Sequence, residues 1–203
     1  VKIYLGNDIA PGFFAWQVPF SSGSLIGLAS TDGKTYEHLN ELLGLKGFDT
    51  KVVGILSGSI PIGLTKSMVK DGVLLVGDAA GQVKPLSGGG LYTGLKAAEI
   101  CGDTIIESLE KNDTSQRFLM RYQERFMKGV GKEIKRGLKI RKVFTGLSNE
   151  EMNRLISAMK KENVKEIIEE KGDIDHPSKL VKPIVKASPS LIKFIGPVLK
   201  NLF

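Results

Sequence analysis

The segment from residue 73 to residue 99 combines residue types that suit the binding of a polar or anionic cofactor. An apolar run, residues 73–76, predicts a short buried strand that ends at Gly77 and Asp78. A helix start that follows a glycine loop offers free N–H groups and a positive dipole end, and glycine lets a ligand approach the backbone closely. The loop contains Gly81, Pro85 and three successive glycines, Gly88, Gly89 and Gly90.

The residues after this loop recur at the spacing of an amphipathic helix, with Lys96 and Glu107 on the far side. The apolar positions are Leu91, Leu95, Ala98, Gly102, Ile105 and Leu109. The segment therefore predicts a strand, a glycine loop and a helix that together cradle a cofactor.

Spacing excludes two common phosphate-binding motifs. A Walker loop ends in Gly-Lys-Ser/Thr, whereas Gly94 is followed by Leu95. A Rossmann fingerprint that began at Gly88 would need glycine where Thr93 stands. A glycine loop that only turns the chain, with Asp78 as a local cap, remains the alternative interpretation.

The same segment resembles the second flavin-binding motif of FAD-dependent reductases and hydroxylases related to para-hydroxybenzoate hydroxylase. The resemblance implies FAD as the cofactor, with Asp78 accepting a hydrogen bond from a ribityl hydroxyl. It also implies that amides near Gly90 and Leu91 face the flavin O2 edge, where a helix start stabilises negative charge on the reduced flavin. The cofactor-binding residues that it implies are Gly77, Asp78, Ala79, Pro85, Gly88, Gly89, Gly90 and Leu91.

A second segment, residues 10–19, carries side chains that could line a hydrocarbon site. In a strand, Phe14, Trp16 and Val18 share one face, which offers apolar area without hydrogen bonds. A sheet face packed on its own core is the alternative.

This second segment, Ala-Pro-Gly-Phe-Phe-Ala-Trp-Gln-Val-Pro, is similar to the Ala-Pro-Gly-Gly-Tyr-x-Trp-x-Phe-Pro segment of archaeal geranylgeranyl reductases. The resemblance implies flavin-dependent reduction of prenyl double bonds in membrane lipid biosynthesis, with a prenylated lipid as substrate and a reduced electron donor. The substrate-binding residues that it implies are Phe14, Trp16, Pro19 and Gly27. Four residues depart from the family pattern. Phe13 stands in place of the second glycine, Phe14 in place of the tyrosine and Val18 in place of the phenylalanine. Ala29 stands in place of the last glycine of a Gly-x-Gly that follows in the family.

The predicted strands and helices that carry these residues indicate an α+β (α/β) fold. The resemblance implies that this fold is the C-terminal part of a glutathione-reductase/para-hydroxybenzoate-hydroxylase-like FAD fold. Residues 1–70 are assigned to an antiparallel substrate-binding sheet. Residues 71–112 are assigned to the last strand, loop and helix of the FAD-binding domain. Residues 113–203 are assigned to a helical C-terminal region.

Local signals mark the individual elements. Helix N-caps are expected at Thr114 or Ser115, and a capping box at Ser148 and Glu151. A short helix is expected over residues 35–43. The predicted strands of the first region cover residues 1–5, 13–18, 24–29 and 51–62.

The sequence contains no Gly-x-Gly-x-x-Gly of the kind that binds the ADP part of FAD after a first strand. We therefore expect the chain to be the C-terminal part of a longer reductase, and no catalytic side chain is assigned within it. Two alternatives stay open. One is an FAD-dependent monooxygenase or halogenase of the same superfamily, and the other is a non-catalytic, basic lipid-binding fragment.

Composition narrows the remaining possibilities. The 203 residues are 41% hydrophobic, which suits a packed protein, and they contain no run of 18 apolar residues, so no membrane-spanning helix is expected. The lone Cys101 cannot form an internal disulfide, which is compatible with a reducing compartment, so a cytoplasmic protein is expected. His38 and His176 lie far apart, so no metal site is expected.

Charge is concentrated in the second part of the chain. Residues 1–90 carry 7 Lys/Arg and 7 Asp/Glu, and residues 91–203 carry 22 and 15. On a helix from Pro189, an apolar side backed by Lys193 and Lys200 could rest peripherally on a membrane or dock on the protein's own core. Nucleic acid is not expected as a partner, because no array of stacking aromatic residues accompanies these lysines.

Overall fold

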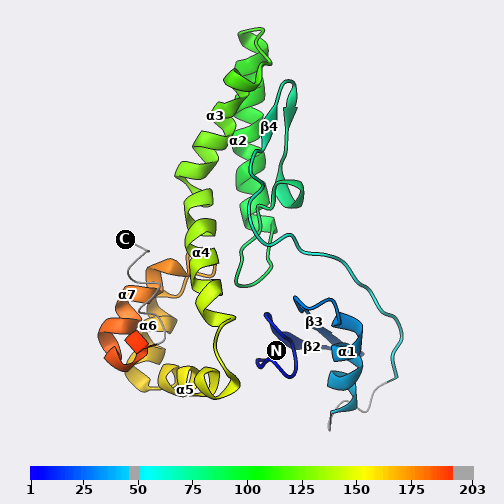
Figure 1. Ribbon diagram of the computed structural model, residues 1–203, viewed down its shortest axis with the longest axis vertical. Coiled ribbons are helices and arrows are strands. Elements are labelled where there is room, and N and C mark those ends of the chain that lie inside the picture. The colour runs from blue at the N-terminus through cyan, green and yellow to red at the C-terminus, as the bar shows by residue number, and fades with distance from the viewer. Residues whose placement is uncertain (46–50, 194–203) are drawn as a thin grey trace.

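The computed structural model describes residues 1–45 and 51–193. These residues form seven α-helices, a three-stranded antiparallel sheet and a two-stranded hairpin. Figure 1 shows an elongated arrangement, with the hairpin and two long helices at one end and the sheet and the C-terminal helices at the other. The predicted α+β class is confirmed.

The three-stranded sheet has the order β1-β2-β3, with strands β1 (Lys2–Tyr4), β2 (Ala15–Phe20) and β3 (Gly23–Leu28). The helix α1 (Thr35–Gly44) covers one face of it, where Ala15 and Leu28 are buried against Leu42. The sheet and this helix confirm the prediction. The strand β2 begins two residues later than predicted, because Phe13 closes a turn by donating its N–H to the carbonyl oxygen of Ala10 at 3.0 Å.

The predicted strand over residues 51–62 is wrong. This segment is extended but pairs with no strand among the described residues, and it crosses open space as the cyan curve in Figure 1. Val53 and Leu56 are 96% and 97% exposed. A strand exists only when neighbouring backbone groups satisfy its N–H and C=O groups, and the described part of this chain offers none.

The predicted buried strand over residues 73–76 is shorter and more exposed than expected. Among residues 1–45 and 51–193, the strand β5 (Val73–Leu74) pairs only with β4 (Val69–Lys70), and Val73 is half exposed because no other strand of this part of the chain lies beside it. A 3₁₀ turn, η1 (Gly77–Ala80), and the glycine loop follow. The predicted helix α2 (Leu91–Glu110) is confirmed.

The main core lies between α2, the hairpin and α3 (Gln116–Lys128). The predicted N-cap is confirmed, since the Ser115 side chain accepts a hydrogen bond from the Phe118 N–H. Tyr122 and Phe126 are fully buried in this core, and Cys101 packs there as a small apolar residue.

The helix α4 (Val130–Phe144) leads from this core back towards the sheet, as Figure 1 shows. The C-terminal helices follow as α5 (Asn149–Met159), α6 (Glu162–Lys171) and α7 (Ser178–Ala187). The capping box of Ser148 and Glu151 is confirmed at the start of α5. Of the tail after Pro189, the described part forms the 3₁₀ turn η2 (Pro189–Leu191), and the predicted tail contacts lie mostly outside the described residues. None of the helices in the described ranges is long and apolar enough to cross a membrane.

Candidate functional site

The residues implied in cofactor binding lie on η1, the glycine loop and the first residue of α2. Gly77 and Gly88 have φ angles of +67° and +73°, which strongly favour glycine. Asp78 is exposed, and its Oδ1 lies 3.0 Å from the position that a Cβ on Gly90 would occupy. The carboxylate therefore stands beside the start of α2, and glycine at position 90 leaves room for it.

The start of α2 leaves groups available to a ligand. Gly90 is the N-cap and supplies no side-chain acceptor to the first N–H groups of the helix. The Asp78 carboxylate makes no hydrogen bond or ion pair within residues 1–45 and 51–193. Free amides at the positive end of a helix dipole, next to a free carboxylate, suit a ligand that has both hydroxyl donors and a partly negative edge.

A buried polar network fixes η1 from the core side. The Gln82 side chain accepts a hydrogen bond from the Gly77 N–H at 2.7 Å and donates one to the Tyr122 hydroxyl at 2.6 Å. The Tyr122 hydroxyl donates in turn to the Leu75 carbonyl at 2.9 Å. Burial raises the pKa of Tyr122, so the phenol remains a neutral donor. The Thr93 hydroxyl donates to the Gln82 carbonyl, which ties the first turn of α2 to the same network.

The aromatic segment meets the glycine loop, although the two are far apart in the sequence. A Cβ on Gly88 would lie 3.2 Å from Cζ of Phe13. Phe13 stacks on Phe14 with ring centroids 4.7 Å apart, and Phe14 meets the edge of Trp16 at 5.9 Å. A row of aromatic rings therefore leads away from the loop.

The structure brings three of the four implied substrate residues to one face of the sheet. Trp16 lies flat over Gly27, where a Cβ would come within 2.6 Å of the indole ring. Phe14 lies next to Trp16 on this face. Pro19, by the alternation of the strand, lies on the opposite face and is exposed near the hairpin turn.

Arg141 on α4 joins the aromatic segment to the glycine loop. Its guanidinium donates to the Pro85 carbonyl at 3.0 Å and to the Gly12 carbonyl at 2.6 Å, and it lies 4.9 Å from the centre of the Phe13 ring. Burial lowers the pKa of Arg141, but a guanidinium is so basic that the group stays charged. The sequence analysis missed this residue because it stands in a basic run whose other members are mostly exposed.

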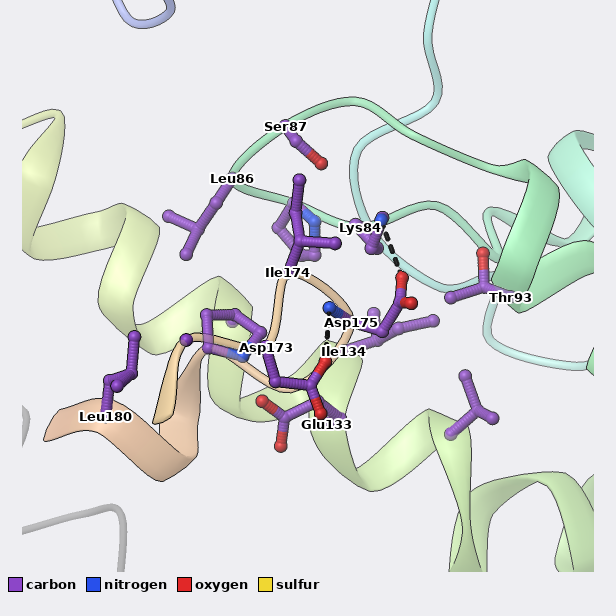
Figure 2. A pocket seen from close by; sticks show the side chains of 15 residues that line it. Lys84, Leu86, Ser87, Thr93, Glu133, Ile134, Asp173, Ile174, Asp175 and Leu180 are labelled. Atoms are coloured by element: carbon purple, nitrogen blue, oxygen red, sulfur yellow. Dashed lines mark hydrogen bonds and ion pairs between the residues drawn. The ribbon is translucent and has the colours of Figure 1, made fainter. Parts of the chain in front are cut away.

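Two apolar pockets flank the loop at Pro85 and Leu86, and Leu86 lines both. One pocket, of about 280 Å³, lies between the aromatic segment and α4. Its walls include Phe13, Phe14, Leu86, Ile140, Arg141 and Phe144. The other, of about 360 Å³, lies between the loop, α4 and residues 172–180 (Figure 2). Its walls include Lys84, Leu86, Thr93, Ile134, Ile174 and Leu180.

Charged side chains hold residues 172–180 against the glycine loop and α4, so that this segment forms one wall of the pocket of about 360 Å³. Figure 2 shows Lys84 paired with Asp175, with Nζ and Oδ1 2.7 Å apart. Glu133 accepts hydrogen bonds from the backbone N–H and the hydroxyl of Ser178. Although desolvation opposes ionisation, hydrogen bonds from the Asp175 N–H and from His176 lower the pKa of Asp173 to about 2. The described residues contain no group of three or more His, Cys, Asp or Glu side chains that could hold a metal ion.

No model of a known protein family matches this sequence. The chain is 35% identical over 210 residues to digeranylgeranylglycerophospholipid reductase 2 of Methanopyrus kandleri, a match that covers 97% of the chain and 52% of the relative. It is 32% identical to digeranylgeranylglycerophospholipid reductase 2 of Methanothermobacter thermautotrophicus, over 98% of the chain and 51% of the relative. The chain is a homologue of about half of such a reductase.

A solved structure shares the fold. A geranylgeranyl bacteriochlorophyll reductase-like protein from Thermoplasma acidophilum superimposes with a TM-score of 0.79 at 19% identity, over 97% of this chain and 50% of that protein. The chain thus spans about half the length of the relatives and of the solved structure that it matches. This share agrees with the expectation that it is part of a longer reductase.

Proposed function

We propose that this chain is part of an FAD-dependent reductase that saturates prenyl double bonds of a membrane lipid. The observation that carries the proposal is the contact between the two motifs. Phe13 lies against Gly88, and Arg141 bonds to the carbonyls of both Gly12 and Pro85. A wall of aromatic side chains beside a cofactor cradle is what the reduction of a hydrocarbon double bond requires.

The residues of the glycine loop fit one side of a flavin. The free Asp78 carboxylate can accept a hydrogen bond from a ribityl hydroxyl, and the uncapped amides after Gly90 can donate to the flavin O2 edge. Reduced FAD, when bound, supplies the hydride. The chain itself orients the flavin through these groups. Gln82 and Tyr122 hold the backbone at Gly77, where the glycine loop begins, in a fixed conformation.

The aromatic segment supplies the substrate side. Phe13, Phe14 and Leu86 line the pocket of about 280 Å³, and they offer contact area without hydrogen-bonding groups. A prenyl chain matches such a wall, because its burial gains apolar contact and expels water from the site. The relatives' names, which specify a digeranylgeranylglycerophospholipid, support the same substrate class.

Peripheral contact with the membrane is part of the proposal. Lys132, Lys135, Lys139 and Lys142 are exposed and recur every three or four residues on α4, so they form one basic stripe. Changing Lys132 and Lys135 to serine should weaken salt-sensitive sedimentation with anionic phospholipid vesicles by about thirtyfold, since each of the two basic residues contributes about 1 kcal/mol there. Changing the exposed Lys66 and Lys70 to serine is the matched control, and equal losses would remove the stripe from the proposal.

The substrate assignment is tested in the complete reductase, supplied with reduced flavin and a geranylgeranyl lipid. We expect Phe14→Ala to lower kcat/KM by about tenfold or more, because a buried phenyl contributes about 1.5–3 kcal/mol, while flavin stays bound. Phe20→Ala, at the exposed end of the same strand, is the control. Release of flavin by Phe14→Ala, or equal losses in the two variants, would contradict the substrate wall. Hydroxylation coupled to oxygen consumption would favour a monooxygenase instead.

A further inference from the structure

The pocket of about 280 Å³ follows the last turns of α4 away from the glycine loop. Nearer its start, α4 packs on this loop, since a Cβ on Gly137 would lie 3.1 Å from Cδ of Pro85. Farther along α4 the pocket is lined by Ile140, Arg141, Phe144 and Thr145. An α-helix rises about 1.5 Å per residue, so Thr145 lies about 12 Å along the axis from the contact with the loop. The pocket therefore leads from the proposed flavin site towards the end of α4.

Met152 lies at the far end of this pocket. It stands in the first turn of α5, beyond the C-terminal end of α4, and lines the pocket together with Leu5 and Asn7 (Figure 1 shows α5 following α4). Its side chain is only 7% exposed. Neither of the hydrophobic clusters formed within residues 1–45 and 51–193 includes it. The burial of Met152 therefore comes from the residues around the pocket, and its side chain closes the pocket at this end.

Hydrogen bonds fix the position of this turn of α5. The capping box of Ser148 and Glu151 holds the start of the helix. The Asn149 side chain accepts a hydrogen bond from the Asn7 N–H at 2.8 Å and donates one to the Asp8 carboxylate at 2.6 Å. Because these bonds tie α5 to the segment after β1, the backbone of the turn cannot move away from the pocket without breaking them.

The side-chain donors at this end of the pocket are already engaged within the protein. The Asn7 amide donates to the Leu147 carbonyl at 3.1 Å, and the Thr145 hydroxyl donates to the Arg141 carbonyl at 3.0 Å. A ligand that reaches this end therefore meets mainly apolar surface, including the methionine. Such an end suits a hydrocarbon chain and not a polar group, which would lose its hydrogen bonds to water there.

We propose that Met152 is a specificity-determining residue that limits how far a prenyl chain enters this pocket. The inference rests on the proposed function, in which the reacting double bond lies against the glycine loop. The part of the chain beyond that double bond then lies along α4 and ends at Met152. A chain with one more isoprene unit meets the methionine before its double bond reaches the flavin, and a shorter chain leaves part of the pocket unfilled.

The test measures the equilibrium binding of saturated prenyl glycerol ethers to the complete reductase by dialysis. The ethers carry a saturated geranylgeranyl chain, or a chain with one isoprene unit more or less. We expect Met152→Ala to raise the affinity for the longer chain, relative to the geranylgeranyl chain, by at least about tenfold, because it lengthens the pocket. Met152→Trp should weaken geranylgeranyl binding, relative to the shorter chain, by at least about tenfold, because the larger ring fills the end of the pocket.

Met159→Ala is the matched control, because Met159 lies on the same helix but does not line the pocket, and it should change both ratios by less than about threefold. Each result is a ratio of two affinities in one variant, so a loss of stability does not imitate it. Unchanged ratios in both Met152 variants, or equal changes in Met159→Ala, would overturn the proposal and leave the substrate class intact. A wild type that binds none of the three ethers would contradict the proposed function, and this inference with it.

Discussion

The glycine loop and the aromatic segment lie side by side but are held by different contacts. The loop rests on a buried network in which Gln82 and Tyr122 satisfy each other and the backbone of η1. The aromatic segment is held by its hairpin and, towards the loop, by the guanidinium of Arg141. The loop geometry is therefore part of the stability of the fold, whereas the hydrogen bonds that link the loop to the aromatic segment come from one side chain, Arg141.

The largest effect should come from the loop side, with Gly81→Ala. A Cβ at this position would overlap the carbonyl oxygen of Gly63, and the φ angle of +66° adds strain. We expect a loss of about 3 kcal/mol or more in the free energy of unfolding. Gly33→Ala is the matched control, because φ is +79° there but nothing lies within 4 Å, and it should cost only about 1 kcal/mol. If denaturant unfolding shows the same loss of free energy for Gly81→Ala and Gly33→Ala, the backbone at Gly63 can move away from the added Cβ, and the prediction is wrong.

Removal of one hydroxyl tests the buried network. Tyr122→Phe leaves the Gln82 amide and the Leu75 carbonyl without their partner, and this should lower the free energy of unfolding by about 1–3 kcal/mol. Tyr36→Phe, on an exposed ring, should change it by less than about 0.5 kcal/mol. If the two variants unfold at the same denaturant concentration, the network does not support the loop.

The aromatic side should respond differently to Arg141→Met. The two carbonyls of Gly12 and Pro85 lose a shared charged donor, so we expect amide exchange in residues 12–14 to rise by about tenfold while global stability falls by only about 1 kcal/mol. Lys142→Met, at the exposed neighbouring position, is the control. A cooperative loss of the whole fold would mean that Arg141 supports the core, and the contrast between the two regions would disappear.

The smallest effect should be a dependence on pH of the segment 172–180, which lines the pocket of about 360 Å³. The pKa of Asp173 is lowered to about 2, so its contribution is complete above the unfolded value of about 3.9 and is lost as the pH falls towards 2. We expect pepsin to cleave near Ile174 increasingly between pH 4 and pH 2. Asp173→Asn should be cleaved at pH 4 already. A wild-type chain that resists pepsin equally at both ends of this range would contradict the assignment.

Local signals in the sequence predicted much of this fold. The helices α1 and α2 and the caps at Ser115 and Ser148 depend on residues within a few positions, and all were found. The strand over residues 51–62 failed because pairing depends on a distant partner. For α2 the spacing predicted the helix correctly but not its buried face. The small residues of α2 pack in the core, and its leucines are exposed.

The candidate site shows the same division. The glycine loop and the aromatic segment could be found from motifs, because their residue types and spacing are local. Gln82, Tyr122 and Arg141 could not, because each acts through a contact with a residue far away in the sequence. No local pattern distinguishes Arg141 from the exposed basic residues around it.

The central claim is that the glycine loop forms one side of a flavin site. The most direct test is the visible absorption spectrum of the complete reductase after desalting, compared between wild type, Asp78→Ala and the control Asp103→Ala at an exposed position of α2. We predict that the wild type and Asp103→Ala retain flavin and that Asp78→Ala loses most of it. A colourless wild type, or equal retention by Asp78→Ala, would contradict the claim.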